Sequence, residues 1–265
     1  STFDGMERSA GFNPSALQSV SVQVEDSPLE LSLYAKVGIH DGSMANVSWL
    51  QELPDPVSKI VWDNYLLVSP SLAKEQGYEE GSMVRVMTDS FTQDLPVYIS
   101  PGQRGSSVAV AIGYGRTEGG VVHKDVGINV QNFAVAGDGM IQYAGIPVKI
   151  EKLNKKYPLA QTQGHHTMHG RQLAVEARHK DYKKTGDVGL HKHKIFSIWG
   201  KHEYNGHKWG LGVDLNSCTG CSACMVACQS ENNIPVVGKK YVLGGREMHW
   251  IRIDRYYSGD ETKSV

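Results

Sequence analysis

The four cysteines of this 265-residue chain all lie within eleven consecutive positions. They are Cys218, Cys221, Cys224 and Cys228, and their spacing is C-x2-C-x2-C-x3-C. Thiolates are soft ligands that suit iron–sulfur clusters. Gaps of two residues allow one tight turn to wrap three thiolates around a cluster, and small residues in the gaps let the backbone come close. The spacing therefore predicts a 4Fe–4S cluster with these four cysteines as its ligands.

Other uses of the cysteines fit the sequence less well. A zinc site made of four thiolates usually has two C-x2-C pairs separated by a longer loop. Disulfides between such close neighbours would close only short loops and add little stability to a chain of this length. A zinc site and a structural or redox-active thiol cluster remain the alternatives.

The number of cysteines is too small for the architecture in which this spacing occurs. In bacterial ferredoxins the fourth cysteine of the run binds a second cluster and a proline follows it, whereas Gln229 follows Cys228 here. If Cys228 serves a second cluster, the first cluster lacks one ligand and the second lacks three. We therefore expect further cysteines beyond Val265 or in a partner chain, with a single self-sufficient cluster as the third possibility. The start at Ser1 without a methionine also suggests a piece of a longer protein.

Short strands dominate the part of the chain before the cysteines. Apolar and polar residues alternate there with period two, and most of these segments are bounded by Gly, Pro, Asn or Asp. One helix interrupts them, with Ser69 or Ser71 as its N-terminal cap and Gly77 at its end. Short strands at this spacing indicate a barrel or a sandwich. The segments are Ser21–Glu25, Leu29–Val37, Ser82–Met87, Leu95–Ile99, Ser107–Ile112 and Ile146–Ile150.

The net charge of −1 conceals two parts of opposite charge. Residues 1–160 contain 12 Lys and Arg against 18 Asp and Glu, whereas residues 161–265 contain 15 against 10 and nine of the eleven histidines. This change in composition predicts a domain boundary near residue 155. We expect a β-barrel domain at 1–152, an extended His- and Lys-rich connector at 153–210 with one helix over Gln172–His179, and an iron–sulfur segment at 211–265.

The composition and the missing motifs exclude several classes of protein. Balanced charge and a pI near 6.8 argue against a nucleic-acid binder. No apolar run approaches about 18 residues, so we expect no transmembrane helix in this chain. The glycine-rich phosphate-binding motifs, a C-x2-C-H haem site and a G-x-S-x-G nucleophile elbow are all missing. We therefore expect no catalytic residue in this chain, and the predicted cluster favours electron transfer rather than substrate chemistry.

Segments on both sides of the cysteines carry a family resemblance. Residues 218–239 read CTGCSACMVACQSENNIPVVGK and residues 245–257 read GREMHWIRIDRYY. Upstream, residues 49–65 read WLQELPDPVSKIVWDNY and residues 163–171 read QGHHTMHGR. These segments resemble the iron–sulfur subunits that accompany molybdopterin oxidoreductases. They are most similar to the large iron–sulfur subunit of alternative complex III, a bacterial quinol-oxidising membrane complex, and the resemblance covers roughly residues 31–257.

The resemblance implies a fold and a function. It implies a mainly β, α+β chain in which a double-psi β-barrel precedes the connector and a partial ferredoxin-like 4Fe–4S domain. It implies an electron-transfer subunit of a respiratory membrane complex that passes electrons toward a haem-containing subunit, with more than one cluster in the whole protein. Its partners would be a multi-haem cytochrome c and integral membrane subunits. These would hold it at the periplasmic face of the bacterial inner membrane.

The barrel also resembles the dinucleotide-binding barrel of molybdenum enzymes, at Ser69–Val86 and at Gly113-Tyr-Gly-Arg116. Gly113 and Gly115 either let the backbone approach a phosphate or simply form a turn at the end of a strand. The homologous part of alternative complex III is thought to have lost the cofactor, so we expect no molybdopterin here.

Two alternative functions stay open. In the first, the chain is the C-terminal part of a molybdopterin-dependent oxidoreductase. In the second, it is an assembly module whose cluster is structural. The connector histidines could place two imidazoles near a metal, at His165, His166 and His169 or at His191 and His193, but none matches the helical H-E-x-x-H spacing. They fit a solvated connector or a docking or proton-binding surface.

Overall fold

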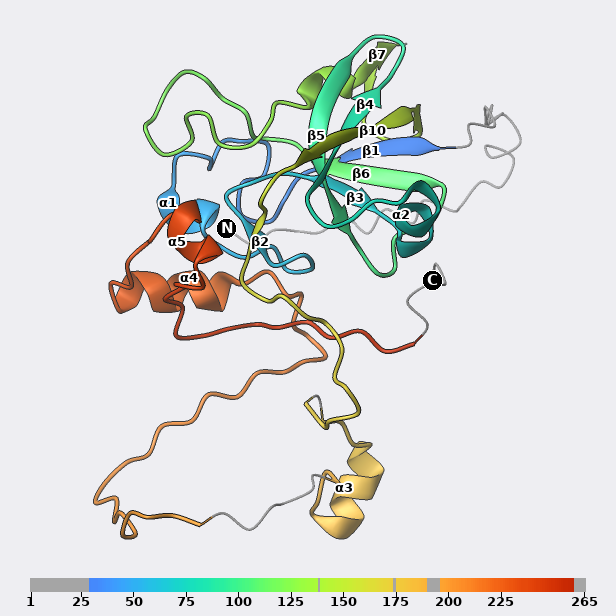
Figure 1. Cartoon of the computed structure of the whole chain (residues 1–265). Helices are drawn as coiled ribbons and strands as arrows, with labels where there is room; N and C mark the ends of the chain where they lie inside the picture. The colour runs from blue at the N-terminus through green and yellow to red at the C-terminus, as the bar shows by residue number, and fades with distance from the viewer. Residues whose placement is uncertain (1–28, 138, 174, 190–195, 260–265) are drawn as a thin grey trace, which may run out of the picture.

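The computed structural model describes residues 29–137, 139–173, 175–189 and 196–259. Residues 1–28 of the predicted barrel domain, and His191 and His193 of the connector, lie outside the described residues. A mixed seven-stranded sheet dominates the described part, with the strand order β10-β4-β5-β3-β6-β1-β9. It curls around one core, as Figure 1 shows. The predicted mainly β architecture is confirmed, whereas the double-psi topology and the ferredoxin-like domain stay predictions.

The strands of this sheet correspond closely to the segments with period-two alternation. The pairs β1/β6 and β3/β5 are parallel, and the other pairs are antiparallel. Inward side chains of β4 alternate with half-buried ones along Ser82–Met87, as its sequence predicts. The strands are β1 Glu30–Tyr34, β3 Leu66–Val68, β4 Ser82–Met87, β5 Thr92–Ile99, β6 Ser107–Ala111, β9 Ile146–Pro147 and β10 Lys149–Lys156.

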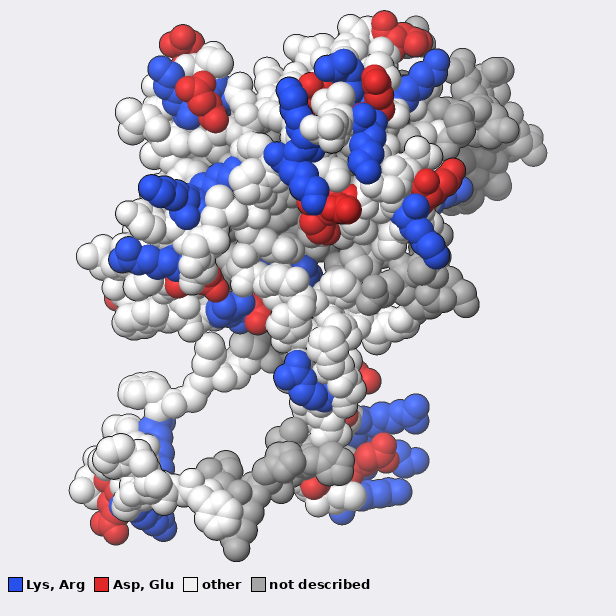
Figure 2. Space-filling model, viewed as in Figure 1, with Lys and Arg blue, Asp and Glu red and all other residues white. Residues whose placement is uncertain are grey.

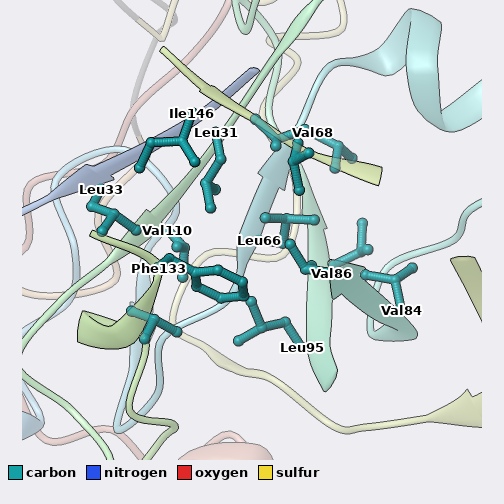
Figure 3. Packing of buried hydrophobic residues seen from close by; sticks show 14 of the residues in the cluster. Leu31, Leu33, Leu66, Val68, Val84, Val86, Leu95, Val110, Phe133 and Ile146 are labelled. Carbon is teal, nitrogen blue, oxygen red and sulfur yellow. The ribbon is translucent and has the colours of Figure 1, made fainter. Parts of the chain in front are cut away.

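The main core fills the concave side of the sheet (Figure 3). The aliphatic side chains of six strands meet there and are almost completely removed from water. Phe133, on the 3-10 helix η2 Gln131–Phe133, closes one side and packs edge-to-face on Phe91 with 4.8 Å between ring centres. The core includes Leu31, Leu33, Leu66, Val68, Val84, Val86, Leu95, Val97, Val108, Val110 and Ile146.

The predicted helix after Ser69 is confirmed. Helix α2 spans Pro70–Gln76, and the Ser69 side chain accepts a hydrogen bond from the Leu72 N–H at 3.0 Å. Gly77 ends the helix in the left-handed conformation, with φ of 65°.

The smaller elements lie around the sheet and along the connector. Two small two-stranded sheets, the hairpin β7/β8 and the long-range pair β2/β11, lie outside the main sheet, and helix α1 lies near α4 and α5 on one side of that sheet (Figure 1). No helix in the described part of the chain is long and apolar enough to cross a membrane. The remaining elements are β2 Ile60–Val61, β11 Ala160–Gln161, β7 Val135–Gly137, β8 Met140–Gln142, α1 Ser48–Gln51, α3 His179–Thr185, α4 Ala223–Glu231 and α5 Lys239–Leu243.

The predicted connector helix over Gln172–His179 is wrong. The helix begins where that segment ends, as α3 at His179–Thr185. Charges explain its position, because Asp181 lies in the first turn, two lysines lie in the last turn, and Gly186 ends it with φ of 64°.

Lys36 follows β1 and is almost completely buried. Its Nζ donates to the backbone oxygen of Asp63 at 2.8 Å and lies 4.4 Å from the centre of the Tyr65 ring and 5.3 Å from that of Tyr114. Removal from water lowers the pKa of Lys36 to about 8, although Asp55 and Asp63 act in the opposite direction. A charged Lys36 therefore costs folding free energy at neutral pH.

The free energy of unfolding should consequently rise with pH through Lys36. Between the folded-state pKa of about 8 and the usual lysine value of roughly 10.4, the unfolded chain binds a proton that the folded chain does not. Stability therefore increases over this window, by about 3 kcal/mol in all. The Lys36→Met variant should lack the rise, whereas Lys74→Met, at an exposed residue of α2, should keep it. Urea unfolding at about pH 7 and about pH 10 measures this, and an identical pH dependence in Lys36→Met and wild type would contradict it.

Candidate iron–sulfur site

The four cysteines lie on one loop and the helix that follows it. Cys218 and Cys221 belong to the loop, and Cys224 and Cys228 lie one turn apart on α4. Gly220 and Ser222 both adopt the left-handed conformation, with φ of 69° and 62°. These two residues turn the chain sharply between the loop cysteines and the helix cysteines. A Cβ added at Gly220 would meet no atom within 4 Å, so the space inside the turn is open.

The thiols face away from the barrel. Cys218, Cys221 and Cys224 are exposed, Cys228 is half-buried, and none is in a disulfide. The opposite face of α4 is buried through Met225 and Gln229, which lie one turn apart. This amphipathic arrangement fixes one face of α4 and leaves the cysteine face free to bind a ligand.

Local hydrogen bonds surround two of the cysteines, and at Cys221 they favour metal binding. The backbone N–H of Ala223 lowers the pKa of the Cys221 thiol, and the Thr219 side chain contributes in the same direction. A lower pKa favours the thiolate, which is the form that binds metal. Asn232 Nδ2 donates to the backbone oxygen of Cys228 at 2.9 Å and lies 3.5 Å from its Sγ.

The described residues contain no group of three or more His, Cys, Asp or Glu side chains placed to hold one metal ion. The structure thus brings the four cysteines to one turn and one helix, but does not gather three of them around a single point. Their chemistry, their shared outward face and the open turn fit a cluster. Their assignment as the ligands stays a prediction.

Two pairs of residues are among the polar contacts that hold residues 211–259, here called the cysteine segment, on the preceding part of the chain, and no local sequence pattern predicts them. Lys239 at the start of α5 forms an ion pair of 2.7 Å with the buried Asp63, whose other carboxylate oxygen accepts from the Tyr157 hydroxyl at 2.9 Å. Gln163 and the backbone of Arg255 exchange two hydrogen bonds of 2.8 and 2.9 Å. Each pair joins residues far apart in the sequence, which is why local patterns do not predict them.

The glycines at the predicted dinucleotide-like turn pack against the chain itself. Gly113 has φ of 92°, and a Cβ there would lie 2.6 Å from the Gly42 nitrogen. Gly115 has φ of 73°, and a Cβ there would lie 2.0 Å from the Asn129 nitrogen. The turn therefore requires both glycines whether or not a dinucleotide binds. The expectation that this chain binds no molybdopterin stays a prediction.

The described connector histidines have contacts of several kinds. The backbone oxygen of His165 accepts a hydrogen bond of 3.1 Å from the Arg255 side chain, and the ring of His166 packs edge-to-face on Tyr257 with 5.4 Å between ring centres. The rings of His165 and His169 are 6.4 Å apart. The first two residues therefore help to attach the connector to the cysteine segment.

Comparison with known proteins gives two short sequence matches. No family model matches the chain. Over 27 residues, or 10% of this chain, it is 74% identical to the iron–sulfur cluster-binding subunit of menaquinone reductase from Nitratidesulfovibrio vulgaris. Over 26 residues it is 50% identical to the iron–sulfur subunit of arsenate respiratory reductase from Chrysiogenes arsenatis, where the match covers 87% of that sequence. The chain spans only 11% of the menaquinone reductase subunit.

The matches define a class of protein. They place the chain with the iron–sulfur subunits of respiratory reductases. Neither match is to alternative complex III, so that finer resemblance stays a proposal. Among solved structures, acetylene hydratase from Pelobacter acetylenicus matches 49% of this chain and 19% of its own, at 17% identity and a TM-score of 0.34. This likeness is too weak to define the fold.

Proposed function

We propose that Cys218, Cys221, Cys224 and Cys228 bind a 4Fe–4S cluster and that the chain transfers electrons in a respiratory complex. The observation that carries this proposal is the arrangement of the cysteine run, with thiols on the outer face of a turn and helix whose inner face is anchored on the barrel. When bound, the cluster would supply one-electron redox chemistry. The fold of the chain would determine where that cluster lies.

The residues of the segment have separate roles in this proposal. The exposed cysteines hold the cluster at the surface, where a neighbouring cluster or another subunit can approach it. Met225 and Gln229 keep α4 in a fixed position on the barrel. Asn232 lies at the sulfur of Cys228, and hydrogen bonds to ligand sulfurs raise the reduction potential of a cluster.

The finer proposal concerns the complex. The segments at 49–65, 163–171 and 218–257 support a role in a quinol-oxidising assembly such as alternative complex III, with a haem-containing subunit as the electron acceptor. In that setting the chain would lie at the periplasmic face of the inner membrane, held there by partner subunits.

Exposed aromatic residues in the connector support partner binding. The connector extends away from the rest of the described chain (Figure 2). Ile198 is 92% exposed, Trp199 80% and Trp209 96%, which is unusual for several large apolar side chains in one stretch of chain. We infer that partner subunits cover these residues in the complex.

Replacing Trp199 and Trp209 together with serine should therefore weaken binding of the partner subunits. Each tryptophan removed from an interface costs on the order of 2 kcal/mol, or at least about tenfold in affinity. Co-purification of the complex measures the loss. Val121→Ser, at a 93% exposed residue of the barrel domain, is the matched control. Equal recovery of partners with both variants would contradict the inference.

The test of the electron-transfer role is reduction of the cluster by a quinol. The intact anaerobic complex is mixed with a reduced quinone analogue, and cluster reduction is followed by EPR. The proposal predicts reduction at potentials within the range of quinones. A cluster that stays oxidised throughout that range would contradict electron transfer. It would instead support a purely structural role, in which the cluster stabilises the anchored helix α4.

A further inference from the structure

Glu52 is a buried carboxylate that joins the barrel to the cysteine segment. It follows α1 and is 1% exposed. One of its oxygens accepts from Trp62 Nε1 at 3.0 Å and from the Gly238 N–H at 2.7 Å. The Val237 N–H donates to both oxygens, at 3.0 and 3.2 Å.

These donors account for the burial of a charge. A carboxylate without hydrogen bonds is very unfavourable in the interior, so its neighbours must supply donors in the correct geometry. No ion pair of Glu52 occurs among the described residues, and its donors are two backbone N–H groups and an indole. Val237 and Gly238 are 185 and 186 positions from Glu52. The contact therefore exists only when the cysteine segment lies on the barrel in one arrangement.

A short, well-ordered connection links this contact to the cysteines. Val237 follows Cys228 by nine positions. Between them, Asn232 donates to the backbone oxygen of Cys228 through both its backbone and its side chain. The Ile234 N–H then donates to the Gln229 oxygen at 2.9 Å, and both of these side chains are buried. A displacement of Val237 would accordingly shift α4 and its cysteines.

We propose that Glu52 is the positioning residue of the cluster: it fixes the segment that holds the cysteines and places a negative charge beside it. This proposal rests on the proposed function. The Glu52→Gln variant keeps the shape but has one acceptor oxygen in place of two and no charge, so the bonds from the Val237 and Gly238 amides should both weaken. The Asp63–Lys239 and Gln163–Arg255 contacts hold the segment independently, and so the variant should fold.

The experiment compares wild type, Glu52→Gln and Glu79→Gln in the intact protein. Glu79 is an exposed barrel carboxylate paired with Lys156, so its variant is the same chemical change away from the segment. Hydrogen exchange at the Val237 and Gly238 amides should be at least about tenfold faster in Glu52→Gln, because each loses a charge-assisted bond. The cluster's reduction potential should also rise in Glu52→Gln, since a nearby negative charge is removed. Glu79→Gln should change neither quantity.

Each outcome decides a different point. Unchanged exchange in Glu52→Gln overturns the contact, and faster exchange with an unchanged potential overturns the role in the cluster. If Glu52→Gln does not fold, wild type alone still tests the contact, because these two amides must exchange at least about tenfold more slowly than unprotected amides. A wild-type protein without iron would refute the proposed function, while the exchange data would still report whether Glu52 holds the segment.

Discussion

The Cys218→Ala variant is expected to lose the EPR signal of its cluster and most of the associated iron and acid-labile sulfide. A cubane that lacks one thiolate ligand has an iron open to water, and Cys218 lies on an exposed loop where water can reach that iron. Metal analysis and EPR of anaerobically purified protein measure the effect. Ser230→Ala, on the exposed face of α4, is the control and should keep the full signal.

A comparison with Cys228→Ala extends this prediction. If the four cysteines bind one cluster, the two variants lose the same signal. If Cys228 binds a second cluster, as in bacterial ferredoxins, its variant changes a different signal. Full iron content and an unchanged spectrum in Cys218→Ala would contradict the assignment of the ligands.

The Gly115→Ala variant is expected to destabilise the barrel by about 2–5 kcal/mol. A left-handed conformation costs a non-glycine residue about 1–2 kcal/mol, and forcing an extra methyl group into a packed site adds about 1–3 kcal/mol. The methyl would lie 2.0 Å from the Asn129 nitrogen and 2.5 Å from the carbonyl carbon of Ile128, so backbone has to move. Urea unfolding of the variant measures the loss.

Gly102 provides a matched control for this prediction. It also has a positive φ, of 89°, but a Cβ there would meet no atom within 4 Å. Gly102→Ala should therefore cost only the conformational term, about 1–2 kcal/mol. An equal loss of unfolding free energy in the two variants would contradict the importance of close packing at Gly115. It would favour the alternative that this turn serves ligand binding.

Local patterns in the sequence predict the strands of the barrel well. Period-two alternation in Ser82–Met87 matches β4, and the cap at Ser69 with the glycine at Gly77 matches α2. Both signals come from residues close together in the sequence, so they can be recognised without knowledge of the fold. The helix predicted over Gln172–His179 is placed too early in the chain. The first helix-ending glycine after it is Gly186, and this is where α3 ends.

The contacts that hold the cysteine segment on the barrel are not visible in the sequence. Glu52 and Gly238 are neighbours only because the tertiary fold packs α4 on α1. Burial of Glu52 has no local sequence signal, because a glutamate after a short helix is usually exposed. The same holds for Asp63, whose partner Lys239 lies in a different part of the chain.

The period-two pattern can also mislead. Trp209, Leu211, Val213 and Leu215 alternate with small or polar residues, yet this described segment is not in a strand and all four side chains are exposed. Alternation specifies a strand only where an edge is available for pairing.

A redox-active iron–sulfur cluster on the run from Cys218 to Cys228 underlies every functional proposal made for this chain. Its most direct test is a potentiometric titration of the anaerobically purified protein, followed by EPR and accompanied by analysis for iron, sulfide and zinc. We predict about four iron atoms and four sulfides for each cubane cluster, with a signal that appears and disappears reversibly with potential. Stoichiometric zinc without acid-labile sulfide, and no signal at any potential, would contradict the claim.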